Sequence, residues 1–207
     1  MFQLPAPSKV VCVGRNYLDH IKELNNQIPN APFFFIKPTT AIVDFAAAIK
    51  LPQNLGELHY ELELAVWVGK DLKDATLAEA ENAIAGYGLG LDLTLRDLQK
   101  KLKEKGHPWE AAKAFDRSLP LTKMLDLKDP QNCMIELEIN GETRQKDSTS
   151  LMLTPILELL VAASKSFTLK SGDILLTGTP KGVGPLKSGD KLEAILNGTN
   201  HFKTEVA

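Results

Sequence analysis

The sequence predicts an α+β fold in which strands predominate. Residues 59–69 (His-Tyr-Glu-Leu-Glu-Leu-Ala-Val-Trp-Val-Gly) place aromatic, aliphatic and β-branched residues in near-alternating order and end at a glycine, which is typical of a strand. A second strand-like stretch, 134–140, runs into Asn140-Gly141, a strong hairpin signal. Helical spacing of apolar residues is confined to shorter segments, of which 156–166 is the clearest.

The composition indicates a soluble protein with one folding unit. The chain has 207 residues, of which 43% are hydrophobic, so it can bury a substantial core, and a single domain 1–207 is the simplest organisation. Its 24 basic and 26 acidic residues are interspersed, which argues against nucleic acid as a partner. The sequence shows no signal-peptide pattern and no apolar run of membrane-spanning length, so we expect a cytoplasmic protein. Cys12 and Cys133 lie in apolar contexts and are expected to be reduced core residues.

Other segments are assigned in chain order. We expect strands at 9–14, 33–36, 86–92 and 172–177 and in two closing segments punctuated by glycines, and helices at 16–28, 76–85, 94–105 and 156–166. Asn16 is the expected N-cap of the first helix, whose apolar stripe extends to Ile28. Lys37 follows the aromatic strand and is expected to be a solvated, structural residue.

An acidic pair in the strand 59–69 predicts a metal site. Glu61 and Glu63 project from the same face, because successive side chains of a strand alternate. That face continues with Ala65 and Trp67, which indicates that it is covered. Two carboxylates held this close repel each other unless a cation lies between them, so we expect a divalent ion here.

The same pattern recurs where no site is expected. Glu136 and Glu138 also alternate along a strand, but that strand belongs to the predicted hairpin 133–146. We expect its acidic face to be solvated, with Arg144 opposite. A Glu-x-Glu pattern is therefore weak support for a metal site by itself.

Asp92 is the candidate third carboxylate. It follows glycines at positions 86, 88 and 90, which clear one face of a strand for a backbone or a ligand. The alternative is that Asp92 caps the helix that follows, and both roles are compatible.

Further polar residues are candidates for catalysis or binding. His20 and Glu23 lie three residues apart on a helix, where a carboxylate can raise the basicity of an imidazole; a simple surface contact is the alternative. Residues 15–30 are a candidate mobile lid, because glycine precedes them and prolines follow. Lys113 lies among small and apolar residues and requires a partner unless its ammonium reaches solvent. The loop 178–184 is not a phosphate-binding loop, but its backbone N–H groups and Thr179 could receive a carboxylate.

Taken together, these segments resemble one known family. The motifs are residues 11–23 (Val-Cys-Val-Gly-Arg-Asn-Tyr-Leu-Asp-His-Ile-Lys-Glu), 34–38 (Phe-Phe-Ile-Lys-Pro), 59–64 (His-Tyr-Glu-Leu-Glu-Leu), 90–99 (Gly-Leu-Asp-Leu-Thr-Leu-Arg-Asp-Leu-Gln), 108–115 (Pro-Trp-Glu-Ala-Ala-Lys-Ala-Phe) and 176–185 (Leu-Thr-Gly-Thr-Pro-Lys-Gly-Val-Gly-Pro). They resemble the fumarylacetoacetate hydrolase superfamily, specifically its short single-domain acylpyruvase and oxaloacetate decarboxylase branch, and they cover most of the chain.

The resemblance implies a fold and a set of site residues. The fold would be a mixed β-sandwich roll with flanking helices, assembled as a homodimer. The resemblance implies Mg²⁺ or Mn²⁺ bound by Glu61, Glu63 and Asp92, catalytic roles for His20, Glu23 and Lys113, and a substrate site lined by Arg15, Arg96, Gln99 and Thr179. Leu95 and Trp67 depart from the family pattern and place the choice of substrate in question, not the mechanism.

The expected reaction is cleavage of the C3 bond of a small 2-oxo acid through a metal-stabilised pyruvate enolate. This would be acylpyruvate hydrolysis, oxaloacetate decarboxylation or both. An alternative within the enzyme class is an oxaloacetate keto–enol tautomerase or related isomerase, which breaks no carbon–carbon bond and demands less of His20. An alternative of another class is a non-catalytic metabolite-binding protein of the same fold.

Overall fold

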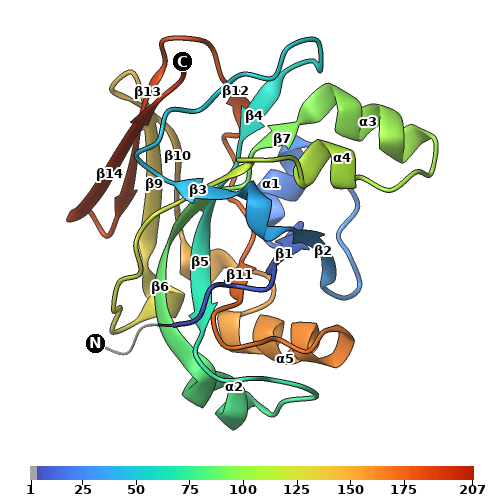
Figure 1. The fold of residues 1–207 in the computed structure, drawn as a ribbon, viewed down its shortest axis with the longest axis vertical. Helices are drawn as coiled ribbons and strands as arrows, with labels where there is room; N and C mark the ends of the chain where they lie inside the picture. Colours follow the sequence, from blue (N-terminus) through green and yellow to red (C-terminus); the bar gives the residue numbers. More distant parts are fainter. Residues whose placement is uncertain (1–3) are drawn as a thin grey trace.

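The computed structural model describes residues 4–207, and its strands form three sheets (Figure 1). The largest has seven strands in the order β2 (Phe33–Lys37), β1 (Val10–Gly14), β11 (Ile174–Leu176), β5 (Leu62–Val68), β6 (Ile84–Leu91), β8 (Leu119–Leu121) and β3 (Ile42–Asp44). Strand pairs β1–β11 and β3–β8 are parallel and the other pairs are antiparallel, so the sheet is mixed.

Two smaller sheets complete the strand arrangement. The second sheet is antiparallel, in the order β10 (Glu142–Ser148), β9 (Met134–Ile139), β13 (Lys191–Leu196) and β14 (Asn200–Glu205). The third contains β12 (Gly184–Pro185), β4 (Leu58–Tyr60) and β7 (Thr94–Leu95). The predominantly β, α+β fold class is therefore confirmed.

Short helices lie around these sheets. They are α1 (Leu18–Glu23), α2 (Leu77–Ala83), α3 (Arg96–Glu104), α4 (Glu110–Lys113) and α5 (Ile156–Ser166), with 3₁₀ turns at Thr39–Ala41, Pro130–Asn132 and Thr149–Leu151. In Figure 1, α2 and α5 lie together at one end of the molecule, whereas α3 and α4 lie beside β7 at the other. No helix in residues 4–207 combines the length and apolarity that crossing a bilayer requires.

Strand β5 is buried on both faces, and this determines where its acidic residue points. Leu62, Leu64 and Val66 enter the main apolar core, which also contains residues of β6, β9 and α5. Ala65, on the opposite face, joins a second cluster with residues of β1, β8 and β11. Because strand side chains alternate, Glu63 lies on the same face as Ala65 and away from the main core.

The predicted strand 59–69 is divided in two at Glu61. Strand β4 precedes Glu61 and pairs with β7 and β12, whereas β5 follows it and pairs with β6 and β11. At the division, the N–H of Leu62 donates to Oε1 of Gln145 at 2.8 Å, not to a neighbouring strand. Glu61 therefore lies at a junction between two sheets.

The first helix is shorter than predicted, and its N-cap was assigned wrongly. Helix α1 begins after Tyr17 and ends at Glu23, and Ile28 is 58% exposed. Asn16 does not cap it, because its amide donates to the carbonyls of Thr154 and Thr177 at 3.0 and 2.9 Å. Those partners are distant in sequence, so local spacing could not reveal them.

The hairpin was predicted correctly, but one of the two acidic residues on its face, Glu136, is not solvated as expected, whereas Glu138 is partly exposed. Asn140 and Gly141 both adopt positive φ, 56° and 81°, as the tight turn between β9 and β10 requires. Glu136 is buried and pairs with Lys146 at 2.9 Å, so it is not solvated. Arg144, expected opposite the acidic pair, instead lies 2.8 Å from Glu142.

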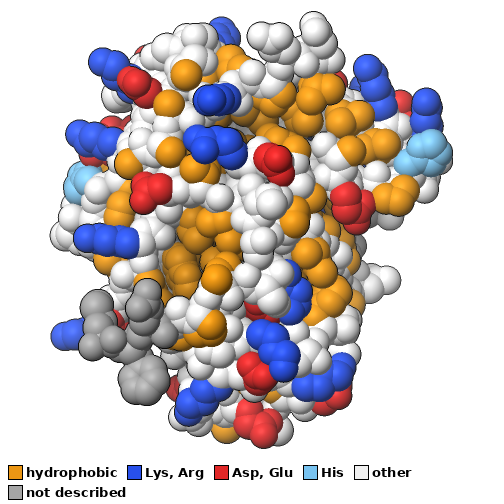
Figure 2. Space-filling view, viewed as in Figure 1, with side chains coloured by type: hydrophobic (Ala, Val, Ile, Leu, Met, Phe, Trp, Pro, Cys, Tyr) orange, Lys and Arg blue, Asp and Glu red, His pale blue; other side chains and the backbone are white. Residues whose placement is uncertain are grey.

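Figure 2 shows groups of exposed hydrophobic side chains on one face of the molecule. Hydrophobic side chains form one group in the middle of that face and another toward its upper right, and basic and acidic side chains lie between and around these groups. Both cysteines are buried and free, as predicted.

Asp173 joins the start of β1 to the turn before β11. Its Oδ1 accepts hydrogen bonds from the backbone N–H and the hydroxyl of Ser8, both at 2.7 Å, and from the N–H of Lys9 at 3.1 Å. Its Oδ2 accepts from Lys9 Nζ at 2.6 Å and from the N–H of Lys170 at 2.8 Å. Burial opposes ionisation of this carboxyl, but the hydrogen bonds from Lys9, Lys170 and Ser8 outweigh it and lower the pKa of Asp173.

Replacing Asp173 by Asn should therefore destabilise the fold by about 2–3 kcal/mol at pH 7, because charge-assisted hydrogen bonds are lost. The stabilisation from the lowered pKa is present above the pKa of an unfolded Asp, about 4, and is lost as the pH falls through the folded value. The difference between wild type and D173N in urea unfolding should accordingly shrink from pH 7 to pH 3.

D71N is the matched control, because Asp71 forms an exposed pair with Lys170 at 2.7 Å. Its effect at pH 7 should be much smaller than that of D173N. Equal losses of stability in the two variants would contradict the role given to Asp173.

Candidate metal and substrate site

Three buried carboxylates lie close together at the start of β5 and the end of β6. Glu61 precedes β5, Glu63 lies within it, and Asp92 follows β6; they are 5%, 2% and 1% exposed. One oxygen from each lies within 4.8 Å of the others. Glu63 pairs with Gly90 in the sheet, and the N–H of Asp92 donates to the carbonyl of Glu61 at 2.8 Å, so the backbone itself brings the three together.

The glycines of β6 serve the packing around this site. A Cβ at Gly88 would lie 2.7 Å from Oγ1 of Thr122 and 2.9 Å from the ring of Trp67. The face cleared by these glycines is therefore filled by protein side chains, not held open for a ligand. Asp92 does not cap α3 either, because that helix begins at Arg96 with no side-chain cap.

Lys113 bridges two of the three carboxylates. Its Nζ lies 2.9 Å from Oε2 of Glu61 and 2.6 Å from Oδ2 of Asp92, and its side chain is only 5% exposed. The alternative in which its ammonium reaches solvent is therefore wrong. Helix α4 presents Lys113 beneath Phe35, whose ring centroid lies 5.2 Å from the ammonium.

Lys37 approaches Asp92 from the other side and is not the solvated residue expected. It is completely buried, and its Nζ lies 2.9 Å from Oδ1 of Asp92. The same ammonium donates to the carbonyl and hydroxyl of Ser118, at 3.1 and 3.0 Å, and to the carbonyl of Lys113. The signal that the sequence offered is the alternation of β2, because Phe33, Phe35 and Lys37 share the face that covers the site.

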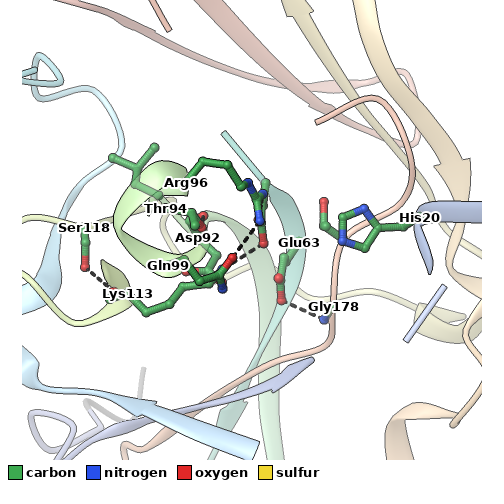
Figure 3. Close-up of polar contacts among 12 residues, drawn as sticks. His20, Glu63, Asp92, Thr94, Arg96, Gln99, Lys113, Ser118 and Gly178 are labelled. Carbon is green, nitrogen blue, oxygen red and sulfur yellow. Dashed lines mark hydrogen bonds and ion pairs between the residues drawn. The ribbon is translucent and has the colours of Figure 1, made fainter. Parts of the chain in front are cut away.

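Arg96 supplies a third cation at this cluster (Figure 3). Its guanidinium pairs with Oε1 of Glu61 and donates to Oε1 of Gln99 at 2.9 Å. Arg96 and Gln99 lie on one face of α3, as their spacing predicted. Three carboxylates thus face three cationic side chains, those of Lys37, Lys113 and Arg96.

The pKa values of Glu61 and Glu63 are shifted in opposite directions. Burial opposes ionisation of Glu61, but Lys113 and Arg96 outweigh it and lower the pKa of Glu61. Burial raises the pKa of Glu63 well above its ordinary value, and repulsion from Asp92 adds to this effect. Glu63 accepts a hydrogen bond from the N–H of Gly178 at 2.6 Å, which only partly offsets both effects.

These residues fit a divalent cation. Oxygen-only ligands suit hard ions such as Mg²⁺ and Mn²⁺, and a cation among the carboxylates would relieve the repulsion that raises the pKa of Glu63. Oδ1 of Asp92 is buried and, although close to Lys37, accepts no well-aligned hydrogen bond. This oxygen could therefore coordinate a metal ion.

His20 reaches the site from α1. It is 6% exposed, and its Nδ1 lies 3.4 Å from Oε2 of Glu23. Burial lowers the pKa of His20, although Glu61 and Glu23 act in the opposite direction. Oε1 of Glu23 accepts from the N–H of Gly182 at 3.0 Å, so α1 is held against the loop 178–184.

Thr179 and Arg15, which were expected to line the substrate site, also form hydrogen bonds within the protein. The Thr179 hydroxyl donates to the carbonyl of Leu62 and accepts from Nε2 of Gln145, both at 2.8 Å. The N–H of Gly178 and the hydroxyl of Thr179 therefore hold Glu63 and β5 in place, and Gln145 is a supporting residue that sequence patterns did not indicate. Arg15 adopts a positive φ of 58° and donates to Oδ1 of Asn26 at 2.9 Å.

One cavity brings nearly all the predicted site residues together. It is lined by Arg15, His20, Glu61, Glu63, Asp92, Arg96, Gln99, Lys113 and Thr179, together with apolar residues such as Phe33 and Trp109. Of the ten predicted residues, only Glu23 does not line the cavity. Its carboxylate instead contacts Nδ1 of His20.

The family of the chain follows from a family model. Residues 9–207 match the model described as fumarylacetoacetate (FAA) hydrolase C-terminal. The chain therefore belongs to the fumarylacetoacetate hydrolase family, as its motifs indicated.

Individual relatives are similar along almost the whole chain. An oxaloacetate tautomerase of Escherichia coli (strain K12) is 51% identical over 195 residues, which is 92% of this chain and 89% of the relative. The mitochondrial oxaloacetate tautomerase of Homo sapiens is 43% identical over 201 residues, covering 95% of this chain and 91% of the relative. The crystal structure of a fumarylpyruvate hydrolase from Pseudomonas aeruginosa, in complex with Mn²⁺ and pyruvate, is 37% identical with a TM-score of 0.92, covering 99% of this chain and 91% of that one.

Proposed function

We propose that this chain is a divalent-metal-dependent enzyme that interconverts the keto and enol forms of oxaloacetate. The observation that carries the proposal is the buried cluster of Glu61, Glu63 and Asp92, bridged by Lys113 and sharing one cavity with His20. The two relatives named oxaloacetate tautomerases, 51% and 43% identical, support this reaction over the C3 bond cleavage that the sequence first indicated.

Enolisation of a 2-oxo acid removes a proton from C3 and places negative charge on the keto oxygen. Glu61, Glu63 and Asp92 would hold the metal ion. When bound, a divalent cation supplies Lewis-acid stabilisation of that developing charge. The remaining work, moving the proton and orienting the substrate, falls to side chains of the chain itself.

Two side chains have the protonation states that this reaction needs. Although burial opposes it, proximity to Asp92 and Glu61 raises the pKa of Lys113, so its ammonium persists and can donate a hydrogen bond to the developing oxyanion. Burial lowers the pKa of His20, so its imidazole is neutral near pH 7 and can accept the C3 proton. His20 then delivers this proton to the keto oxygen, directly or through a water molecule, which gives the enol and restores the neutral imidazole.

Hydrolysis of an acylpyruvate is the second candidate function. The same enolate forms when the C3 bond breaks, and the fumarylpyruvate hydrolase relative supports this reaction. Hydrolysis additionally needs a base to activate water, and the contact of 3.4 Å between His20 and Glu23 favours that role. Decarboxylation of oxaloacetate would give the enolate without water.

Replacing Asp92 by Asn should abolish turnover and weaken Mn²⁺ and Mg²⁺ binding about 100-fold or more, because a charged ligand is lost. Calorimetric titration with each ion and loss of enol absorbance would measure the two effects. E136Q is the control, since Glu136 is also a buried strand carboxylate but lies outside the cavity. Unchanged metal affinity in D92N would contradict the assignment of the metal ligands.

Replacing His20 by Gln should separate the two candidate reactions. We expect tautomerisation to fall about 10- to 100-fold, since solvent can exchange part of the proton, and hydrolysis to fall by about 1,000-fold or more. Enol decay and pyruvate release, followed with one enzyme preparation, would give both rates. Metal affinity should stay unchanged, and full hydrolytic activity in H20Q would remove His20 from the mechanism.

We further propose that residues 1–207 form one catalytic domain, that residues 15–30 act as a lid, and that the active form is a cytoplasmic homodimer. The hydrophobic side chains grouped on the face in Figure 2 support self-association, because exposed apolar patches commonly mark interfaces. Sedimentation equilibrium at micromolar concentration should give twice the mass of 22.7 kDa. A monomer at that concentration would refute the dimer.

A further inference from the structure

A second group of cations surrounds the outer part of the cavity. The ammonium of Lys103 lies 4.8 Å from the ring centroid of Trp109. Trp109 packs edge-on against Phe33 at a centroid separation of 5.9 Å, and the guanidinium of Arg15 lies 5.6 Å from the Phe33 centroid. All four side chains line the cavity that contains the carboxylate cluster. Two aromatic rings that contact each other are therefore each close to one cation: Lys103 at Trp109 and Arg15 at Phe33.

The sequence of α3 explains why Lys103 reaches this cavity. Arg96, Gln99 and Lys103 occupy positions i, i+3 and i+7 and therefore lie on one face of the helix. Arg96, at the start of this face, binds Glu61 in the metal cluster. Lys103 lies almost two turns further along the same face, away from that contact and toward Trp109.

In the part of the chain that the structure describes, neither Lys103 nor Arg15 is paired with a carboxylate. Within residues 4–207, no acidic side chain forms an ion pair with Lys103 or Arg15. Arg15 donates to the uncharged Oδ1 of Asn26 and to the carbonyl of Gln27. In contrast, Arg96 and Lys113 are both paired with site carboxylates.

The electrostatics indicate that an anion would be bound favourably here. Partial burial lowers the pKa of Lys103 to about 8, and the positive charges of Arg15, Arg96 and Lys113 contribute to the shift. Lys103 is still mostly protonated at pH 7, so the crowding of like charges persists. A negative group between Lys103 and Arg15 would relieve it.

Resting on the proposed function, we propose that Lys103, together with Arg15, binds the distal carboxylate of the substrate and so selects 2-oxo dicarboxylates over 2-oxo acids with an uncharged distal group. The 2-oxo acid end lies at the carboxylate cluster and Arg96, and the distal end extends toward Trp109. Contact with the Trp109 ring restricts the flexible Lys103 side chain, which reduces the entropy lost when it binds the anion. Lys103 is thus a specificity-determining residue that does not contact the reacting atoms.

The test compares oxaloacetate with its 4-ethyl monoester, which keeps the 2-oxo acid end but carries no distal charge. In K103M, the KM for oxaloacetate should rise about 10- to 30-fold, because a charge-assisted hydrogen bond is lost. The value of kcat should change less than about threefold, and both constants for the monoester should remain near those of the wild type. K103R should restore most of the preference, since it keeps the charge.

K101M controls for the general loss of positive charge, because Lys101 lies on α3 but does not line the cavity. It should behave as wild type toward both compounds. Equal losses with oxaloacetate and the monoester in K103M would overturn the proposal, and so would equal effects of K101M and K103M.

Calorimetric binding of the same two compounds to the Mn²⁺-loaded protein makes the comparison without turnover. If wild type binds oxaloacetate but does not tautomerise it, the proposed function fails, and the ratio of the two affinities in K103M still decides the role of Lys103. A ratio equal to that of the wild type would reject the role, and a ratio reduced about tenfold would support it.

Discussion

The mutual repulsion of three buried carboxylates is the constraint on which the rest of the site depends. Ionised groups removed from water are costly unless they are paired and hydrogen-bonded. Here Lys113 bridges Glu61 and Asp92, Lys37 flanks Asp92, and Arg96 pairs with Glu61. Within residues 4–207, the N–H of Gly178 is the one hydrogen-bond donor to Glu63, and burial together with repulsion from Asp92 raises the pKa of Glu63. The metal ion that we propose would supply the positive charge that is missing beside Glu63.

The compensating cations come from parts of the fold that are remote in sequence. Lys37 ends β2 at the edge of the large sheet, Arg96 begins α3, and Lys113 ends α4. The ammonium of Lys37 also binds the carbonyl of Lys113 and both oxygens of Ser118, so it fastens α4 and the segment before β8 to the sheet. Assembly of the charge cluster is therefore inseparable from assembly of the sheet.

Local patterns predicted the strands and the acidic pair because those features depend on neighbouring residues. The spacing of Glu61 and Glu63 was sufficient to predict that their carboxylates lie close together, although the strand is divided at Glu61, and turn chemistry was sufficient for Asn140-Gly141. The same alternation could not separate Glu63 from Glu136, since the difference lies in partners such as Lys146 on another strand. The motifs of the family supplied what alternation lacked at the site.

Features that depend on distant partners were missed. The start of the first helix was placed too early because the amide of Asn16 is held by the carbonyls of Thr154 and Thr177, far along the chain. Lys37 was expected in solvent because nothing near it in sequence offers a carboxylate; Asp92 reaches it only through the sheet. In each case a long-range polar contact overrides the local preference.

The backbone of Arg15 is strained, and its side chain places a positive charge in the cavity. A residue with a side chain at φ 58° is strained by about 1 kcal/mol, which glycine would largely avoid. Glycine would also remove the guanidinium that lies on Phe33 at the mouth of the cavity. Backbone stability alone would therefore favour the smaller residue, at the expense of a positive charge in the cavity. Arg15 is thus a position at which the least strained backbone and the most strongly charged cavity require different residues.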